Sequence, residues 1–210
     1  MSAPEISPRL IGIAGPSCAG KSELARRLAE QLSAPVLPLD SYYYDLSHLA
    51  PAERGQQNFD APQMLDYDLF LRHLAELSQG REIARPIYDF SSHCRTGQAD
   101  IVRPGRFLIV EGLFLFYWEA VRTLLKARVF VDLDEQSCLQ RRLRRDVQER
   151  GRTPESVKAQ FAGTVRPMAE KYITPTRRFA DLIVRGDDPL EKSVAAVMAL
   201  LNLSGNTGNL

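Results

Sequence analysis

Short apolar runs of β-prone residues recur along the chain and alternate with segments in which apolar residues have helical spacing. The apolar runs cover residues 10–14, 36–39, 107–110, 127–131 and 182–184. Helical spacing covers residues 20–32, 64–77, 116–125, 135–149, 154–172 and 189–203. Because strands that alternate with helices join as parallel neighbours, the pattern predicts an α/β fold with a five-stranded parallel sheet flanked by helices.

Residues 81–105 depart from this alternation. Their prolines, glycines and β-branched residues, in "REIARPIYDFSSHCRTGQADIVRPG", predict a small β-insert. We see no linker between two domains, so residues 1–210 are interpreted as one domain. An arginine-rich helical lid is expected at about 140–165, and residues 204–210 are expected to form a disordered tail.

The first strand is followed by the spacing Gly15-x-x-x-x-Gly20-Lys21-Ser22 and then by a helical segment, which is the context of a phosphate-binding loop. In such a loop, glycines allow backbone amides to cradle an anion at a helix N-terminus. Lys21 then reaches the β- and γ-phosphates of ATP, and the Ser22 hydroxyl binds Mg²⁺. We expect Lys21 to face solvent and phosphate rather than the core. The alternative is a chance glycine-rich turn.

Composition limits the possible classes of protein. The chain has 210 residues, 44% hydrophobic content and a net charge of +1, which favours a globular fold and gives no indication of nucleic-acid binding. Its longest apolar run, "FLIVEGLFLFYW", is interrupted by Glu111, so no membrane association is expected. Three cysteines without metal-ligand spacing, and no secretory segment, favour reduced thiols in the cytoplasm.

Acidic residues follow three of the predicted strands. Because ligands bind at the carboxyl ends of parallel strands, Asp40 and Glu111 are candidates for the site. Asp40 can accept the proton of an attacking hydroxyl or hold magnesium, and Glu111 can order the Mg²⁺ waters opposite Ser22. Asp132 and Asp134 are interpreted instead as helix caps or solvated turn residues.

One helix and its end concentrate six arginines within residues 141–152. Three interpretations remain open: a solvated helix face paired with Asp146 and Glu149, a nucleic-acid patch, and a lid over phosphates. Neither the net charge nor interleaved aromatic residues support the second. The third is favoured because guanidinium groups stabilise the charge of a transferring phosphoryl group.

From about residue 10 to 188 the chain resembles the uridine kinase (uridine–cytidine kinase) family of P-loop kinases. The resemblance rests on "GPSCAGKS", "LDSYYYD", "NFDAPQMLDYDLF", "PIYDFSSHCR" and "LRRDVQERGRTPESVKAQF" with the following "RPMAEKYITPTRRFADLIVRG". It implies a P-loop kinase fold that transfers the ATP γ-phosphoryl group, with Mg²⁺, to the 5′-hydroxyl of uridine and cytidine. It also implies a homo-oligomer, with a tetramer as the family tendency.

The resemblance further implies roles for residues at matching positions. Asp40 matches the general base. The nucleoside side would comprise Tyr43, Phe59, Asp60, Tyr88, His93, Arg142 and Gln160, with Asp60 and Arg142 on the ribose hydroxyls and Tyr88 and His93 on the base. The residues expected at the phosphates are Gly15, Pro16, Ser17, Cys18, Ala19, Gly20, Lys21, Ser22, Glu23, Arg145, Arg150 and Arg152.

Some positions depart from the family pattern. Pro16 and Cys18 stand where small residues are usual, Pro16 lacks one cradle amide, and Ala61 replaces the usual histidine. Related kinases of pantothenate, nicotinamide riboside or ribulose phosphate are the nearest alternatives. A nucleotide-dependent switch is disfavoured, because the chain has no Asn-Lys-x-Asp segment. The sequence leaves open the preference between uridine and cytidine and the use of GTP as donor.

Overall fold

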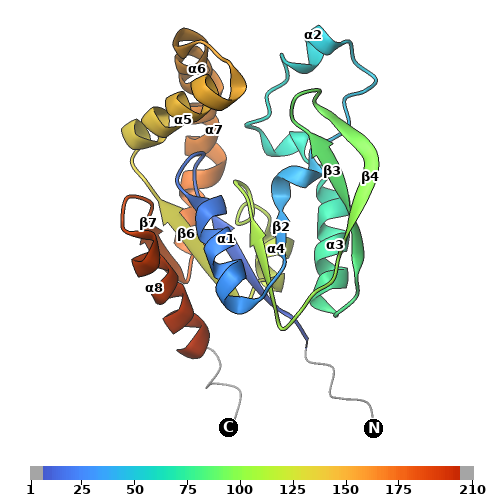
Figure 1. Cartoon of the computed structure of the whole chain (residues 1–210), viewed down its shortest axis with the longest axis vertical. Coiled ribbons are helices and arrows are strands. Elements are labelled where there is room, and N and C mark those ends of the chain that lie inside the picture. Colours follow the sequence, from blue (N-terminus) through green and yellow to red (C-terminus); the bar gives the residue numbers. More distant parts are fainter. Residues whose placement is uncertain (1–6, 204–210) are drawn as a thin grey trace.

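The computed structural model describes residues 7–203 and centres on a parallel sheet with the strand order β2-β5-β1-β6-β7 (Figure 1). The strands are β1 (Arg9–Ala14), β2 (Val36–Pro38), β5 (Phe107–Glu111), β6 (Ala127–Asp132) and β7 (Leu182–Arg185). Each overlaps one predicted apolar run to within one residue at either end, so the predicted sheet is confirmed. The expected tail at 204–210 lies outside the described residues.

Alternating side chains of the central strands build a hydrophobic core on each face of the sheet. On β1, Ile11 and Ile13 belong to one core and Leu10 and Ala14 to the other, as the period of two in a strand requires. The first core packs against α1 (Lys21–Leu32) and α8 (Leu190–Leu203), which lie side by side. The second packs against α3 (Tyr67–Ser78) and α4 (Glu119–Leu124). The sheet is therefore flanked by helices on both faces.

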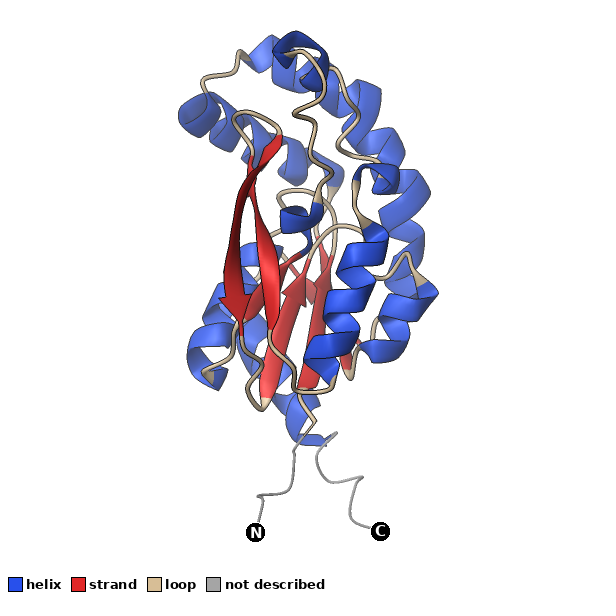
Figure 2. Ribbon diagram, turned by 90° about the vertical axis from the view of Figure 1, so that its right-hand side faces the viewer, coloured by secondary structure: helices blue, strands red, loops and turns tan. Residues whose placement is uncertain are grey.

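The β-insert is a hairpin of two antiparallel strands, β3 (Ile83–Asp89) and β4 (Cys94–Val102), that stands apart from the parallel sheet (Figure 2). The short helix α2 (Pro51–Arg54), which the hydrophobic pattern did not predict, lies near the tip of the hairpin (Figure 1). Arg54 of α2 donates to the carbonyl of Ser92, at 3.2 Å, and so ties the helix to the hairpin turn.

The arginine-rich segment predicted to form a lid, called the lid below, comprises α5 (Glu135–Arg150), α6 (Pro154–Gln160) and α7 (Arg166–Met168). The helical segment predicted over 154–172 is confirmed, but it is not a uniform α-helix, because π-helical turns occupy Phe161–Val165 and Ala169–Ile173. Pro167 and Pro175 have no amide to donate to residues 163 and 171, and each of these residues lies within a π-helical turn. The lid therefore changes helix type beside Gln160 and Thr164.

Two further helix starts differ from the predicted ones. Before α3, residues Pro62–Met64 form a 3₁₀ turn, and the side chain of Asp66 accepts from the amide of Leu69 and caps the helix. The segment before α4 is a turn in which Phe116 is fully buried in the core. In both segments, apolar residues of a turn have helical spacing because their side chains pack in the core, so the predicted helices start too early.

Candidate functional site

The phosphate loop (residues 15–22) joins β1 to α1 at the carboxyl edge of the sheet. Gly15 has a φ of 147°, and a Cβ on it would lie 2.3 Å from the carbonyl oxygen of Val131 on β6, so no larger residue fits. Cys18 and Gly20 also have positive φ values, 65° and 109°. Such conformations turn successive amides toward one side, and α1 adds its N-terminus. The loop has the form of an anion cradle.

Lys21 lies within this cradle. Its side chain is buried, with 8% of the residue exposed, and its Nζ donates to the Pro16 carbonyl at 2.8 Å. The expectation that Lys21 faces solvent is therefore wrong. Its charge acts on two nearby carboxylates, Asp40 and Glu111, whose pKa values it lowers against the larger effect of burial. The loop thus holds a fixed cation beside two acids.

Ser22 and Glu111 meet at the first turn of α1 and the end of β5. The Ser22 hydroxyl donates to Oε1 of Glu111 at 3.1 Å. Burial raises the pKa of Glu111, and Asp40 adds to the rise, whereas Lys21 and the Ser22 hydrogen bond oppose it. A hydroxyl and a carboxylate are hard oxygen ligands, and Mg²⁺ takes few of these from a protein because it keeps several waters. The pair therefore fits the predicted magnesium site.

Asp40 follows β2 in a 3₁₀ turn (Leu39–Tyr42) and is partly buried. Burial raises its pKa above the usual range of an aspartate, while the charges of Lys21, Arg145 and Arg150 oppose that rise. Asp40 is thus within electrostatic reach of both the phosphate loop and the lid. A raised pKa makes a carboxylate a better proton acceptor near neutral pH.

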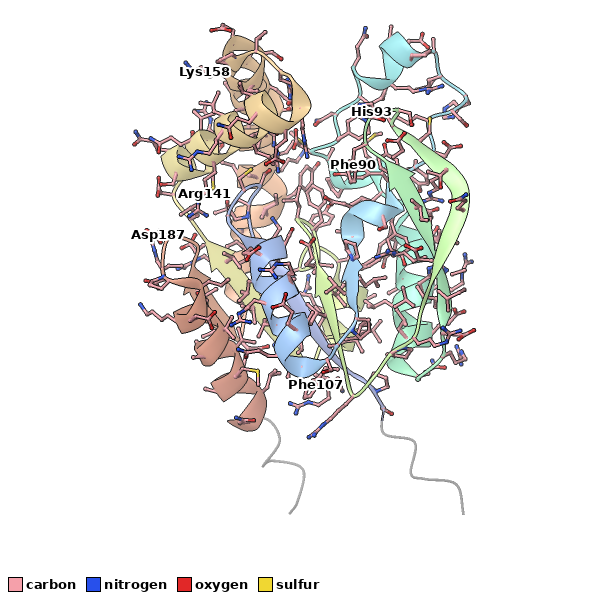
Figure 3. All side chains as sticks on the ribbon, in the orientation of Figure 1. Phe90, His93, Phe107, Arg141, Lys158 and Asp187 are labelled. Carbon is pink, nitrogen blue, oxygen red and sulfur yellow. The ribbon has the colours of Figure 1, made fainter. Side chains whose placement is uncertain are left out.

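Aromatic rings from the hairpin and from the segment before α3 form a cluster. The Tyr43 hydroxyl donates to the Phe59 carbonyl at 3.0 Å, and the Tyr43 ring lies 5.4 Å from that of Tyr88. Phe59 and His93 stack with ring centroids 4.4 Å apart. Figure 3 labels Phe90, which sequence reasoning missed, beside this cluster; its ring lies 5.2 Å from Tyr88. The structure therefore brings together four residues predicted on the nucleoside side.

His93 and Tyr88 offer polar atoms from within this cluster. Burial lowers the pKa of His93, which favours the neutral imidazole with one donor and one acceptor nitrogen. The Tyr88 hydroxyl is buried, and among residues 7–203 it has no hydrogen-bond partner. A buried hydroxyl of this kind is available to a ligand.

Asp60 lies between the aromatic cluster and the lid and is buried. Its Oδ2 accepts from the Thr164 hydroxyl at 3.0 Å, and its charge raises the pKa of both Asp40 and Tyr43. Thr164 belongs to the first π-helical turn of the lid and has no sequence motif that marks it. The lid therefore contacts the predicted ribose-binding carboxylate directly.

The arginines of the lid surround Asp146, which has no exposed surface. Arg145 donates through Nε to Oδ1 of Asp146 at 2.9 Å, and Arg142, Arg150 and Arg152 lie 3.4, 3.5 and 3.7 Å from its carboxylate oxygens. The interpretation of a solvated helix face paired with Asp146 is therefore wrong. Asp146 is the buried centre of the cluster.

Gln160 and the phosphate loop accept further hydrogen bonds from these arginines. Arg142 donates to the Ser17 hydroxyl at 3.1 Å and to Oε1 of Gln160 at 3.2 Å. Arg152 donates to the same Gln160 oxygen and to the Ser156 hydroxyl, at 2.8 Å for the latter. Four residues predicted by resemblance thus form one network that joins the phosphate loop to α5, to α6 and to the turn between these helices.

The family described as "Phosphoribulokinase / Uridine kinase family" matches residues 10–188. The chain belongs to this family. Similar proteins include one named uridine kinase from Brevibacillus brevis (strain 47), 44% identical over 181 residues, which are 85% of this chain and 85% of that protein. Another of that name, from Aliivibrio fischeri (strain MJ11), is 42% identical over 182 residues, 83% of this chain and 85% of that protein.

Solved structures show the same fold at lower identity. Phosphoribulokinase from Rhodobacter spheroides superposes with a TM-score of 0.62 at 14% identity, over 89% of this chain and 74% of that chain. D-glycerate 3-kinase from Cryptococcus neoformans superposes with a TM-score of 0.62 at 16% identity, over 87% and 88% of the two chains. The P-loop kinase fold that the resemblance implies is confirmed.

Beside the phosphate loop of this family member lies a hollow of about 210 Å³ that sequence reasoning missed. Arg141 donates to the Gly186 carbonyl at 2.9 Å and to the Ala19 carbonyl at 3.4 Å, and so bridges the turn after β7 to the loop. A Cβ on Gly186 would lie 2.1 Å from the Ala19 oxygen, which explains glycine there. Figure 3 labels Arg141 and Asp187 on this side.

A larger groove of about 590 Å³ runs along α1 and opens beside Ser22 and Glu111. Small residues such as Ala25 and Ala29 form its floor, and Arg85 of the hairpin lies on its wall. The groove therefore connects the candidate magnesium site with solvent.

Other predicted residues have ordinary surroundings. Glu23 forms an exposed ion pair with Arg26, 2.6 Å between the charged atoms, and Asp134 caps α5 by accepting from the Ser137 amide at 2.9 Å. Asp132 pairs with Arg177 at 3.3 Å. The cap predicted for Asp134 is confirmed, whereas a role of Glu23 in nucleotide binding stays a prediction.

The described residues contain no metal-binding cluster, disulfide or membrane-spanning helix. Within residues 7–203, no group of three or more His, Cys, Asp or Glu side chains is placed to hold a metal ion. Cys18, Cys94 and Cys138 are free thiols. In the same residues, no helix has both the length and the apolar character needed to cross a membrane.

Proposed function

We propose that this protein is a uridine–cytidine kinase that transfers the γ-phosphoryl group of ATP to the nucleoside 5′-hydroxyl and yields UMP or CMP. The observation that carries the proposal is the electrostatic coupling of Asp40 to both sides of the site: the charge of Lys21 in the phosphate loop lowers the pKa of Asp40, and the charge of Asp40 raises the pKa of Tyr43 in the aromatic cluster. Identities of 42–44% to proteins named uridine kinase support the choice of acceptor.

On the donor side, the phosphate loop binds the ATP phosphates through its backbone amides and Lys21. Ser22 would hold Mg²⁺ directly and Glu111 would hold it through water, and at this position the ion would supply neutralising charge for the transferred group. The hollow bridged by Arg141 adjoins the loop and accommodates the rest of the nucleotide. Use of GTP as an alternative donor belongs to the same proposal.

On the acceptor side, Asp60 binds the ribose 2′- and 3′-hydroxyls and exchanges its Thr164 contact for them. Phe59 and Tyr43 line the sugar and base, and Tyr88 and His93 bind the polar edge of the pyrimidine. The neutral imidazole can donate to the uracil carbonyl or accept from the cytosine amine. This combination supports both pyrimidine ribonucleosides as substrates.

At the junction, Asp40 accepts the 5′-hydroxyl proton as the oxygen attacks the γ-phosphorus, and the bond between that phosphorus and the β–γ bridging oxygen breaks to release ADP. Lys21 and the lid arginines stabilise charge on the equatorial oxygens, which is where a loose phosphoryl-transfer transition state carries it. Arg145, Arg150 and Arg152 supply the guanidinium groups, and Arg142 binds the ribose hydroxyls beside Asp60. The proposal also includes assembly into a homotetramer, as the family resemblance implies.

Initial rates with ATP and a panel of acceptors test this function. The panel contains uridine, cytidine, their 2′-deoxy analogues, pantothenate, nicotinamide riboside and ribulose 5-phosphate. We expect kcat/KM for uridine and cytidine to exceed that of every other acceptor by at least about tenfold, since a site that binds an acceptor hydroxyl rejects analogues without it. A faster rate with any other acceptor would overturn the proposal.

A further inference from the structure

Asp146 stands out among the charged residues that the mechanism does not use. Of the described residues, only Asp60 and Asp146 are buried carboxylic acids, and Asp146 has no exposed surface at all. A carboxylate without access to solvent needs partners, because the protein interior solvates a charge poorly. Among residues 7–203, its ion-pair partners are the lid arginines.

The backbone of Asp146 organises the same arginines. Its carbonyl oxygen accepts from the amides of Gly151 and Arg152, the latter at 3.1 Å. Gly151 has a φ of 62°, which turns the chain back at the end of α5. Arg150 before this turn and Arg152 after it therefore both lie near the carboxylate of Asp146.

One negative charge balances only one of the four guanidinium groups around it. The contact of Arg142 Nε with Asp146 Oδ2 is an ion pair at 3.4 Å without a hydrogen bond, since neither atom has a hydrogen-bond partner among residues 7–203. Arg145 and Arg150 also act electrostatically on Asp40. The cluster therefore keeps an excess of positive charge that is directed toward the reacting centre.

We propose that Asp146 is the positioning residue of the lid, which gathers four arginines into one cluster so that Arg145, Arg150 and Arg152 converge on the transferring phosphoryl group, whereas Arg142 is also held by Ser17 and Gln160. Without the carboxylate, four like charges repel one another and each guanidinium group loses its fixed orientation. Because the cluster acts on charge that develops during transfer, the loss appears in kcat. This inference rests on the proposed kinase activity.

The test compares Asp146→Asn, Asp146→Glu and a control, Asp181→Asn. The Asn variant keeps the shape and removes the charge, and the Glu variant keeps the charge and moves it by one methylene. Asp181 accepts from the side chain of Arg128 at 2.6 and 3.1 Å before β7, at the sheet edge opposite the site, so its loss costs an ion pair without touching the lid. Thermal unfolding, kcat and both KM values are measured for each.

We expect Asp146→Asn to lower kcat by at least about tenfold, with less than about threefold change in the uridine KM, as for a contact made in the transition state. Asp146→Glu should recover part of kcat, and Asp181→Asn should lower the unfolding temperature without changing kcat. A kcat within about threefold of wild type for folded Asp146→Asn, or a loss confined to the uridine KM, would overturn the proposal. Failure of both Asp146 variants to fold would also overturn it, in favour of a structural role.

These outcomes are distinct from failure of the proposed function. If the wild-type enzyme phosphorylates another alcohol faster than uridine, the assignment of the acceptor is wrong. The three variants are then assayed with that alcohol, and the same change in kcat decides the role of Asp146.

Discussion

The donor side and the acceptor side of the site are built from different materials. The donor side consists of backbone amides, the buried Lys21 and the Ser22–Glu111 pair, all attached to the central sheet. The acceptor side consists of rings, the neutral His93 and the Asp60–Thr164 contact, attached to the hairpin and the lid. The donor side therefore binds its ligand mainly through charges held in place by the central sheet, whereas the acceptor side binds its ligand mainly through ring stacking and hydrogen bonds.

This difference separates two kinds of substitution. A change on the donor side should lower the rate with every acceptor, because it removes charge from a reaction that all acceptors share. A change on the acceptor side should alter the ranking of acceptors, because stacking and hydrogen bonds distinguish them. The predictions below test that separation, from the largest expected effect to the smallest.

Among the substitutions that lie on only one side of the site, Lys21→Ala should have the largest effect. Removal of the cation within the phosphate loop should lower kcat/KM by about 10³-fold with uridine and cytidine alike, as for loss of a preorganised group that stabilises transition-state charge. Steady-state rates with both nucleosides measure this. Lys126→Ala, which removes an exposed lysine, serves as the control. Retention of more than about a tenth of kcat/KM would remove the loop from the catalytic site.

Asp60→Ala should affect the ribose. A carboxylate that binds two hydroxyls through charge-assisted hydrogen bonds contributes about 2 to 3 kcal/mol, so uridine kcat/KM should fall by about 10²-fold. The 2′-deoxynucleosides, which lack one of these hydroxyls, should lose far less. Parallel rates with uridine and 2′-deoxyuridine give the ratio, and an unchanged ratio would exclude Asp60 from the sugar site.

The acid limb of the pH profile should belong to Asp40. Because burial raises its pKa, protonation removes the base at a pH above the usual titration range of an aspartate. The rate should therefore fall as pH decreases through that raised pKa, by about tenfold per unit below it. Asp40→Asn should lose this limb. A limb that persists unchanged in Asp40→Asn would assign it to another acid, and Glu111 is the nearest with a raised pKa.

Tyr88→Phe should have the smallest effect on the rate, and it should change the nucleoside KM without changing the free energy of unfolding. The Tyr88 hydroxyl has no partner within residues 7–203, so its removal should leave the free energy of unfolding unchanged. The nucleoside KM should rise about 2- to 10-fold, the equivalent of one lost hydrogen bond of 0.5 to 1.5 kcal/mol. A change in stability with no change in KM would indicate a structural hydroxyl.

The sequence was informative where chemistry follows local spacing. Apolar runs predicted the strands, and a motif between strand and helix predicted the loop. The Ser22–Glu111 pair followed from the rule that parallel strands present their carboxyl ends at one edge. Each of these inferences needs only residues that are close in the chain or on neighbouring strands.

Other features depend on contacts that no local pattern contains. The charge pattern of α5 does not distinguish an aspartate on a solvated face from one enclosed by four arginines, since burial of Asp146 depends on how α6 packs. Thr164 has no motif, and it reaches Asp60 through a contact 104 residues apart in the chain. The sequence predicts that Lys21 faces solvent. Its burial depends on how the loop folds over its side chain, which is a tertiary feature that local spacing does not contain.

The central claim is that Asp40 joins the two sides by accepting the 5′-hydroxyl proton, and single-turnover rates of Asp40→Asn measured beside equilibrium binding test it most directly. The substitution keeps the size and hydrogen-bonding reach of the side chain and removes its basicity. We predict that the rate falls about 10²- to 10⁴-fold, the usual contribution of a general base, while the dissociation constants of Mg·ATP and uridine change only a few-fold. A fall of less than about threefold would contradict the claim, because a loose transition state would then need positioning alone. A large loss of Mg·ATP affinity would contradict it too, by assigning Asp40 to the metal.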